Sequence, residues 1–149
     1  MATQIDDDDD ECPFCQIANN QTDTEILMRD DELLCFRDAK ADAGLHLLVI
    51  TCTHIDSCKA LRAQHIPTVE RMGEMGRDAL EKNKAGDLTD IRLGFHVPPF
   101  SSVPHLHLHA LSPAGEMSEG WQRRYGPRSH WFITVDQVLT QLRTRGRIK

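Results

Sequence analysis

Three histidines alternate with two leucines at positions 105 to 109, in the order His105, Leu106, His107, Leu108 and His109. A period of two is that of a β-strand, so the imidazoles are expected on one face and the leucines on the other, inside a core. Rings two residues apart lie roughly 7 Å from each other along a strand, close enough to line one small site. Each buried imidazole needs a hydrogen-bond partner, and histidine changes charge near neutral pH. The pattern therefore predicts a chemical site.

Three kinds of chemistry could use this triplet. Two histidines separated by one residue make a good pair of metal ligands. An imidazole can also act as a general acid or base, or attack an electrophile while a neighbouring ring handles the proton. The triplet alone leaves all three open, so the choice depends on the rest of the chain.

Composition limits the class of protein. The 149 residues, 40% hydrophobic and 27% charged, suit one soluble globular domain. Five cysteines, including Cys35 and Cys52 within apolar stretches, favour a reducing compartment, so we expect the cytoplasm or nucleus. No apolar run approaches a membrane span, and the first residues lack a signal-peptide core. A net charge of −6 argues against a nucleic-acid polymer as partner but permits a mononucleotide.

Secondary structure follows from periodicity and breaker residues. We expect a disordered acidic tail over 1–11 and one α+β domain over 12–149, with about five antiparallel strands and two or three helices. Expected strands lie near 25–28, 33–36, 46–51, 90–97 and 105–109, with a loop over 38–44. Helices are expected over 12–18, from Pro67 to a stop between 82 and 86, and after a capping box of Thr134 and Gln137. Their buried positions should be Val69, Met72, Gly76, Ala79 and Leu80, then Val135, Val138, Leu139 and Leu142.

At this point the chain resembles the histidine triad (HIT) family of nucleotide hydrolases and transferases, whose motif is His-φ-His-φ-His-φ-φ with φ apolar. The motif is complete in residues 105–111, and the resemblance extends from about Cys12 to Leu111. Residues 36–38 resemble the ribose-contacting strand end, and 46–50 with His54 resemble a second signature, although Thr51 and Cys52 depart from it. Residues 94–104 and 131–134 look closest to the third type of histidine triad nucleotide-binding protein, a branch linked to adenosine 5′-monophosphoramidase activity.

The resemblance implies a HIT-like fold, an antiparallel meander sheet with one long helix, and a role for each histidine. His107 matches the nucleophile, which would attack the α-phosphorus while donating its other N–H to a backbone carbonyl of the motif. His109 is expected beside the leaving group, and Ser102 would contact the leaving atom. His105 completes the catalytic set.

The implied nucleoside pocket is built from separate parts of the chain. Asp38 should accept hydrogen bonds from the ribose hydroxyls, and an aromatic face can stack on a base. The apolar positions that match this pocket are Phe14, Ile17, Phe36 and Ala39, and the polar ones are His46 and His96. His96 stands where many relatives have asparagine.

Cys12 and Cys15 form a Cys-x-x-Cys pair, which by itself fits zinc, redox chemistry or core packing. Some members of the family complete such a pair with two histidines, and the matching positions here are His54 and His105. The resemblance thus implies a possible structural Zn²⁺ held by two cysteines and two histidines. No cofactor is expected for catalysis itself.

The expected function is hydrolysis of the P–N bond in nucleoside phosphoramidates of the AMP–amine or AMP–lysine type, releasing AMP through a nucleotidyl-histidine. The alternatives are a purine-nucleotide-binding regulatory or scaffold protein with incidental hydrolysis, and a metal hydrolase using all three histidines. Relatives join their sheets, so a homodimer is expected by analogy. DNA-end or cap processing is not expected, because proteins of the superfamily with those roles usually carry an added basic or substrate-gripping domain, and only about forty residues follow Leu111 here. The arginine-rich end from Arg123 is expected to be a solvated surface. The alternative is that residues 121–131 shape the leaving-group pocket.

Overall fold

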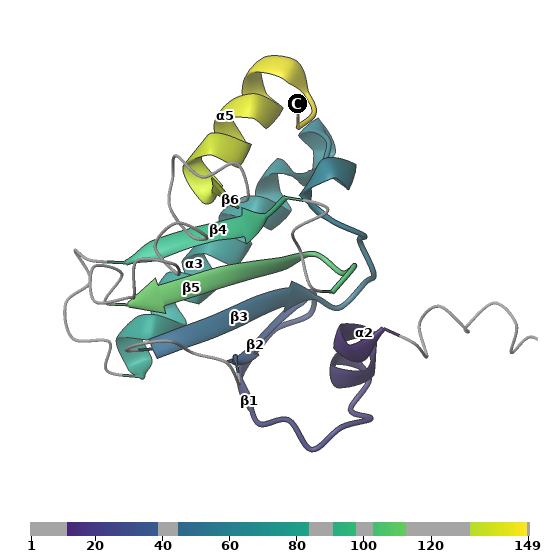
Figure 1. The fold of residues 1–149 in the computed structure, drawn as a ribbon, viewed down its shortest axis with the longest axis vertical. Helices are drawn as coiled ribbons and strands as arrows, with labels where there is room; N and C mark the ends of the chain where they lie inside the picture. Colours follow the sequence, from purple (N-terminus) through teal and green to yellow (C-terminus); the bar gives the residue numbers. More distant parts are fainter. Residues whose placement is uncertain (1–11, 39–44, 84–90, 98–102, 113–131, 149) are drawn as a thin grey trace, which may run out of the picture.

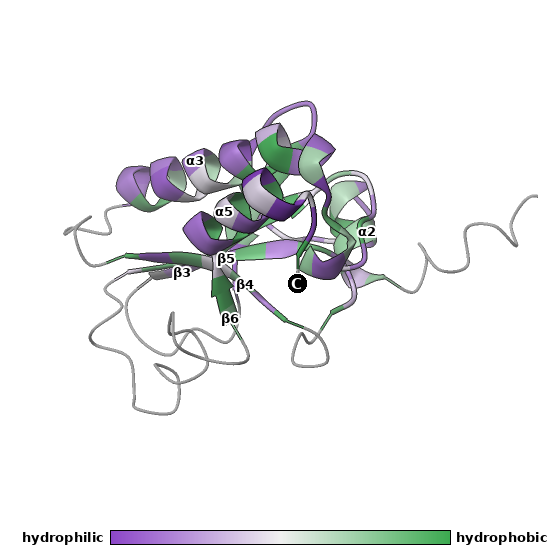
Figure 2. Ribbon diagram, turned by 90° about the horizontal axis from the view of Figure 1, so that it is seen from above, coloured by the Kyte–Doolittle hydropathy of each residue, from purple (hydrophilic) through white to green (hydrophobic). Residues whose placement is uncertain are grey.

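The computed structural model describes residues 12–38, 45–83, 91–97, 103–112 and 132–148. In these ranges one antiparallel sheet carries two helices on one face, and a short helix lies beside one end of the sheet (Figure 1, Figure 2). The strands are β1 (Ile26–Arg29), β2 (Leu33–Arg37), β3 (Leu45–Thr51), β4 (Arg92–His96), β5 (His107–Ser112) and β6 (Phe132–Thr134). The α-helices are α2 (Pro13–Ala18), α3 (Ile66–Lys82) and α5 (Val135–Arg145), and 3₁₀ turns over Cys58–Ala60 and Ala63–His65 lead into α3.

The strand order is β1-β2-β3-β5-β4-β6, all neighbours being antiparallel. The α+β class and the expected helices are confirmed, and the meander holds for β1 to β3. Beyond β3 the chain passes through α3 and returns so that β5 lies between β3 and β4. The sixth strand, β6, was not expected, because three residues directly before a helix are too few to show an alternation. The acidic tail and the loop over 39–44 lie outside the described residues.

Strand β5 is held from behind by α3. Leu106, Leu108 and Ala110 are buried, and α3 packs against this side of the sheet. A Cβ at Gly76 of α3 would lie 3.1 Å from Leu108 Cδ2, so the absence of a side chain there lets the helix approach β5 closely. Burying a leucine fully contributes about 1.5–3 kcal/mol. The alternation of β5 thus turns Leu108 and Ala110 to the core and His107 and His109 to the opposite face.

The two long helices have the buried faces that their periodicity predicts. In α3 the buried residues include Val69, Met72, Gly76, Ala79 and Leu80. The capping box before α5 is confirmed: Gln137 N–H donates to Thr134 Oγ1 over 3.2 Å, and Thr134 N–H donates to Gln137 Oε1 over 2.8 Å. Since Thr134 also ends β6, this cap fixes α5 directly against the sheet edge. In the described part of the chain, every helix is too short or too polar to cross a membrane.

We expect Gly94→Ala to destabilise the fold, because a Cβ at position 94 would lie 2.5 Å from the Ile133 carbonyl oxygen and 2.6 Å from the Phe132 ring. Overpacking of this kind costs about 1–3 kcal/mol, and relief requires β6 to move. Chemical unfolding would measure the loss. The matched control is Gly73→Ala in α3, where the added Cβ makes only a 3.4 Å contact. That variant should be neutral or more stable by up to about 1 kcal/mol. Equal stability of the two variants would contradict this view of β6.

Candidate active site

The three histidines of the triad lie together in the structure, although only two belong to the strand. His107 and His109 share one face of β5, with ring centroids 4.9 Å apart, closer than the backbone repeat because the rings lean together. His105 lies in the bend before β5, where its N–H bonds to the Val103 carbonyl over 2.8 Å. The expected strand over 105–109 therefore begins two residues later. All three residues are at most 5% exposed.

A hydrogen bond within the motif favours one tautomer of His107. Its Nδ1–H donates to the main-chain carbonyl of His105 over 2.6 Å, within the motif, as the resemblance implied. A neutral imidazole carries one ring proton, so Nε2 of His107 keeps its lone pair. Burial lowers the pKa of His107 from its usual 6.5, while the His105 carbonyl and Asp38 oppose that shift. His107 is therefore neutral at pH 7 and has a lone pair for attack.

His109 is oriented by a chain of polar groups that crosses the sheet. His46 on β3 and His109 on β5 approach to 2.9 Å between Nε2 and Nδ1, and Asp38 Oδ2 lies 3.5 Å from His46 Nε2. His46 Nε2 and His109 Nδ1 thus share one hydrogen bond, and the Asp38 carboxylate, which only accepts hydrogen bonds, lies beside them. His46, expected among the substrate-binding residues, is 2% exposed and contacts His109.

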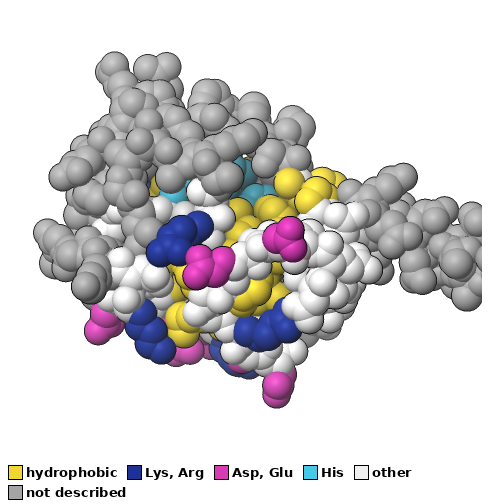
Figure 3. Space-filling view, turned by 90° about the horizontal axis from the view of Figure 1, so that it is seen from below, with side chains coloured by type: hydrophobic (Ala, Val, Ile, Leu, Met, Phe, Trp, Pro, Cys, Tyr) yellow, Lys and Arg dark blue, Asp and Glu magenta, His cyan; other side chains and the backbone are white. Residues whose placement is uncertain are grey.

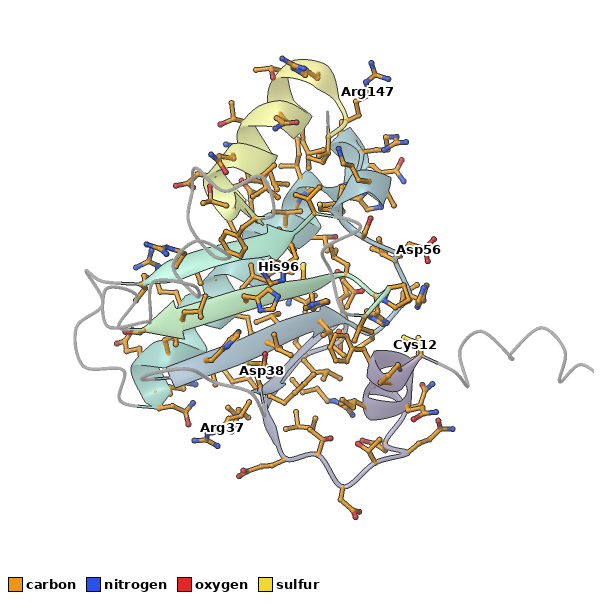
Figure 4. The ribbon with its side chains drawn as sticks, in the orientation of Figure 1. Cys12, Arg37, Asp38, Asp56, His96 and Arg147 are labelled. Carbon is orange, nitrogen blue, oxygen red and sulfur yellow. The ribbon has the colours of Figure 1, made fainter. Side chains whose placement is uncertain are left out.

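Aromatic rings enclose the histidines from two sides. Phe14 of α2 meets His107 edge-on, with centroids 4.9 Å apart, and meets Phe36 at 5.7 Å. Ile17 packs in the same cluster, so three of the expected base-pocket residues lie together beside His107. Figure 4 shows this face of the sheet, with Cys12 marking α2. In the space-filling view, histidine side chains are visible beside hydrophobic ones (Figure 3).

The other wall is built around His96 of β4. Its ring lies 4.5 Å from that of His109 and 5.6 Å from that of Phe132, measured between centroids. His96 is paired with Phe132 of β6 in the sheet register. Three histidines, His46, His109 and His96, thus lie in a row across β3, β5 and β4, and Asp38 and His96 are labelled in Figure 4. No pattern in the sequence indicated the contact between Phe132 and His96, because it depends on the unexpected sixth strand.

The two cysteines and two histidines expected to bind metal form one cluster. Their ligand atoms all lie within 4.8 Å of one another. His105 Nδ1 is 3.2 Å from Cys12 Sγ and 3.4 Å from Cys15 Sγ, and His54 Nδ1 is 3.2 Å from Cys15 Sγ.

Both rings of this cluster are anchored on their far sides. His105 Nε2–H donates to the Thr51 carbonyl, and His54 Nε2–H donates to Asp56 Oδ1, each over 2.8 Å. Such bonds fix the tautomer, so that each Nδ1 lone pair is turned toward the sulfurs. Neither Thr51 nor Asp56 was expected in this role. The one sign of this role in the sequence was the position of Asp56, a carboxylate two residues after the candidate ligand His54. Ser102 and Ala39, also expected in the site, lie outside the described residues.

Comparisons with known proteins agree with this geometry. A family model described as "Scavenger mRNA decapping enzyme C-term binding" matches residues 11–125. The solved structure of a histidine triad protein from Clostridium difficile covers 68% of this chain and 89% of its own, with a TM-score of 0.62 and 29% identity. The chain belongs to the histidine triad family.

Two curated relatives carry the same name. Adenosine 5′-monophosphoramidase HINT3 of Xenopus tropicalis is 45% identical over 132 residues, which is 88% of this chain and 86% of that protein. The protein of this name from Mus musculus is 44% identical over 137 residues, 91% of this chain and 83% of that protein. The similarity therefore extends over most of the length of this chain and of each relative.

We expect acid to destabilise the fold through its buried imidazoles. Burial lowers the pKa of His46 from 6.5 to about 4, with Asp38 raising it and His107 lowering it further. The unfolded chain binds this proton first, so stability that is present above pH 6.5 is lost as the pH falls toward 4. The loss from His46 is on the order of 3 kcal/mol. Urea unfolding across this range would measure it, and His46→Gln should flatten the dependence. If the stability of His46→Gln depends on pH as steeply as that of the wild type, His46 is not the group responsible for the acid sensitivity.

Proposed function

We propose that this chain is an adenosine 5′-monophosphoramidase, which hydrolyses the P–N bond of AMP–amine and AMP–lysine compounds to AMP. The observation that carries the proposal is the neutral, oriented His107, whose Nε2 lone pair is turned away from the bond to the His105 carbonyl. The names of the relatives support the same activity.

In the first step, His107 Nε2 attacks the α-phosphorus and forms an N–P bond while the bond from phosphorus to the amine nitrogen breaks. The leaving nitrogen takes a proton from the imidazolium form of His109, the nearest such group on the same face of β5, and His109 becomes neutral. Since His46 accepts no proton near neutral pH and engages His109 at Nδ1, the donor atom of His109 is Nε2. Ser102 would contact the leaving atom.

In the second step, water attacks the same phosphorus. His109 takes the proton that the water loses, the N–P bond to His107 breaks, and AMP leaves. The sum is one water consumed and one amine and one AMP released, with both histidines returned to their starting forms. Two moderate barriers thus replace one high barrier.

The nucleoside of the substrate would lie against the Phe14 side of the site. Phe14, Phe36 and Ile17 offer an apolar surface for the base, and the Asp38 carboxylate, 19% exposed in its side chain, can accept from ribose hydroxyls. Ala39 and His96 complete the proposed contacts. This surface suits a purine nucleoside monophosphate.

The Cys12, Cys15, His54 and His105 cluster fits a structural Zn²⁺. In a tetrahedral zinc site, Zn–S bonds of about 2.3 Å and Zn–N bonds of about 2.0 Å separate sulfur from nitrogen by roughly 3.5 Å. The observed separations of 3.2–3.4 Å are close to that value. Two thiolates would balance the charge of the ion. The ion would hold α2 against the segment before β5, and it supplies no step of the reaction.

We further propose a homodimer in the cytoplasm or nucleus. The outer edge of β4 is occupied by β6, so among the described strands a second sheet could be joined at β1 or β6. A nucleotide-binding scaffold with incidental hydrolysis is the alternative function, and it requires no attacking lone pair at position 107.

His107→Asn tests the nucleophile. We expect hydrolysis of an adenosine phosphoramidate to fall by at least about 10³-fold, because the amide cannot form the N–P bond, while AMP still binds. Mass spectrometry of the wild type quenched with denaturant at alkaline pH, where the N–P bond is stable, should detect a nucleotide on His107 during turnover. The matched control is His65→Asn, outside the site at the start of α3. Turnover by His107→Asn at the wild-type rate would favour the scaffold alternative.

Metal analysis tests the zinc proposal. The wild-type protein should retain about one Zn²⁺ per chain after dialysis, and Cys15→Ser should lose it, because three ligands hold the ion far more weakly. Cys52→Ser is the matched control, since Cys52 packs against the same small cluster without being a ligand. Zinc retained at full occupancy by Cys15→Ser, or no zinc in the wild type, would refute the site.

A further inference from the structure

One residue belongs to both the cysteine–histidine cluster and the nucleophile. The ring of His105 faces Cys12 Sγ and Cys15 Sγ through Nδ1, and its main-chain carbonyl accepts the proton of His107 Nδ1 over 2.6 Å. The same ring is anchored at Nε2 to the Thr51 carbonyl at the end of β3. The ring that faces the sulfurs and the carbonyl that selects the tautomer of His107 therefore belong to one residue.

A second connection runs through Phe14, one of the two residues between the cysteines. Phe14 contacts the ring of His105 with centroids 5.8 Å apart and the ring of His107 with centroids 4.9 Å apart, both edge-on. Cys12 and Cys15 flank it in the sequence, and Cys15 N–H points to Cys12 Sγ over 3.4 Å. Phe14 therefore joins the short segment that carries both sulfurs to the ring of His107.

We infer that Cys12, Cys15 and His54 are positioning residues for the nucleophile, and that Zn²⁺ bound by them and His105 selects the attacking tautomer of His107. This inference rests on the proposed zinc site and on the proposed role of His107. It goes beyond a brace for the fold, because occupancy of the site changes the reactivity of a group that does not touch the ion.

The physical reason lies in the small difference between the two neutral tautomers of an imidazole. Only the form with the proton on Nδ1 keeps the lone pair on Nε2 for attack on phosphorus. The His105 carbonyl stabilises that form by one hydrogen bond, worth about 0.5–1.5 kcal/mol net and dependent on angle. With the ion bound, the His105 ring is fixed at both nitrogens. Without it, the ring is held at Nε2 and by weaker contacts to the sulfurs.

The test uses the whole chain labelled with ¹⁵N at histidine, stripped of metal by a chelator and then given one equivalent of Zn²⁺. Long-range ¹H–¹⁵N spectra report which ring nitrogen of each histidine carries a proton. We expect zinc to produce ligation signals at Nδ1 of His54 and His105 and, in the same titration, to increase the Nδ1–H form of His107. In single turnover, formation of nucleotidyl-His107 should accelerate about tenfold, the factor that corresponds to one such hydrogen bond.

Internal and matched controls separate this effect from general stabilisation. The His46 signals should stay unchanged, because a looser fold would shift the buried histidines together. Cys15→Ser should show no response of His107 to zinc, and Cys52→Ser should respond like the wild type. Ligation at His54 and His105 with no change at His107 would overturn the inference, as would the absence of ligation. The spectra need no substrate, so they test the effect of zinc on the His107 tautomer separately from the activity. A chain without any phosphoramidase activity would refute the proposed function, and the spectra would still decide whether zinc changes the tautomer.

Discussion

The hydrogen bond from His107 Nδ1–H to the His105 carbonyl is the constraint on which the site depends. It can form because the chain bends before β5: Pro104 has no N–H, His105 N–H turns back to Val103, and Leu106 N–H bonds to the Ile55 carbonyl over 2.6 Å. In a regular strand the carbonyl at position 105 would belong to the backbone pattern of the sheet. The departure from strand geometry therefore supplies the acceptor that a nucleophilic imidazole needs.

Burial sets the protonation of the site, and the core sets the burial. Leu108 is inaccessible because α3 lies against β5, and this packing presents His107 and His109 together on the opposite face. Once there, the imidazoles are poorly solvated, so charging them is costly and the pKa values of His46 and His107 are low. Asp38 is the one carboxylate in this polar chain, and it acts on His109 through His46. The site is thus a row of buried imidazoles with the Asp38 carboxylate at one end.

The walls of the site come from opposite ends of the chain. Phe14 lies in α2, the first described helix, and Phe132 lies in β6, which leads directly into α5, the last one. Both rings contact members of the triad: the ring centroids of Phe14 and His107 are 4.9 Å apart, and those of Phe132 and His109 are 6.3 Å apart. A site with this construction exists only when the sheet is complete, so its geometry depends on the integrity of the whole fold.

The sequence by itself determined the face of the triad, the buried stripes of the helices, the capping box and the cysteine–histidine ligand set, because each follows from local spacing or from a family motif. It did not reveal that His105 stands outside the strand, that β6 closes the edge of β4, or that His46 contacts His109 and not solvent. Those features bring together residues separated by 36 to 63 positions, counting His96 to Phe132 and His46 to His109. Contacts at such separations are fixed by the packing of the whole sheet, so only the tertiary structure could decide them.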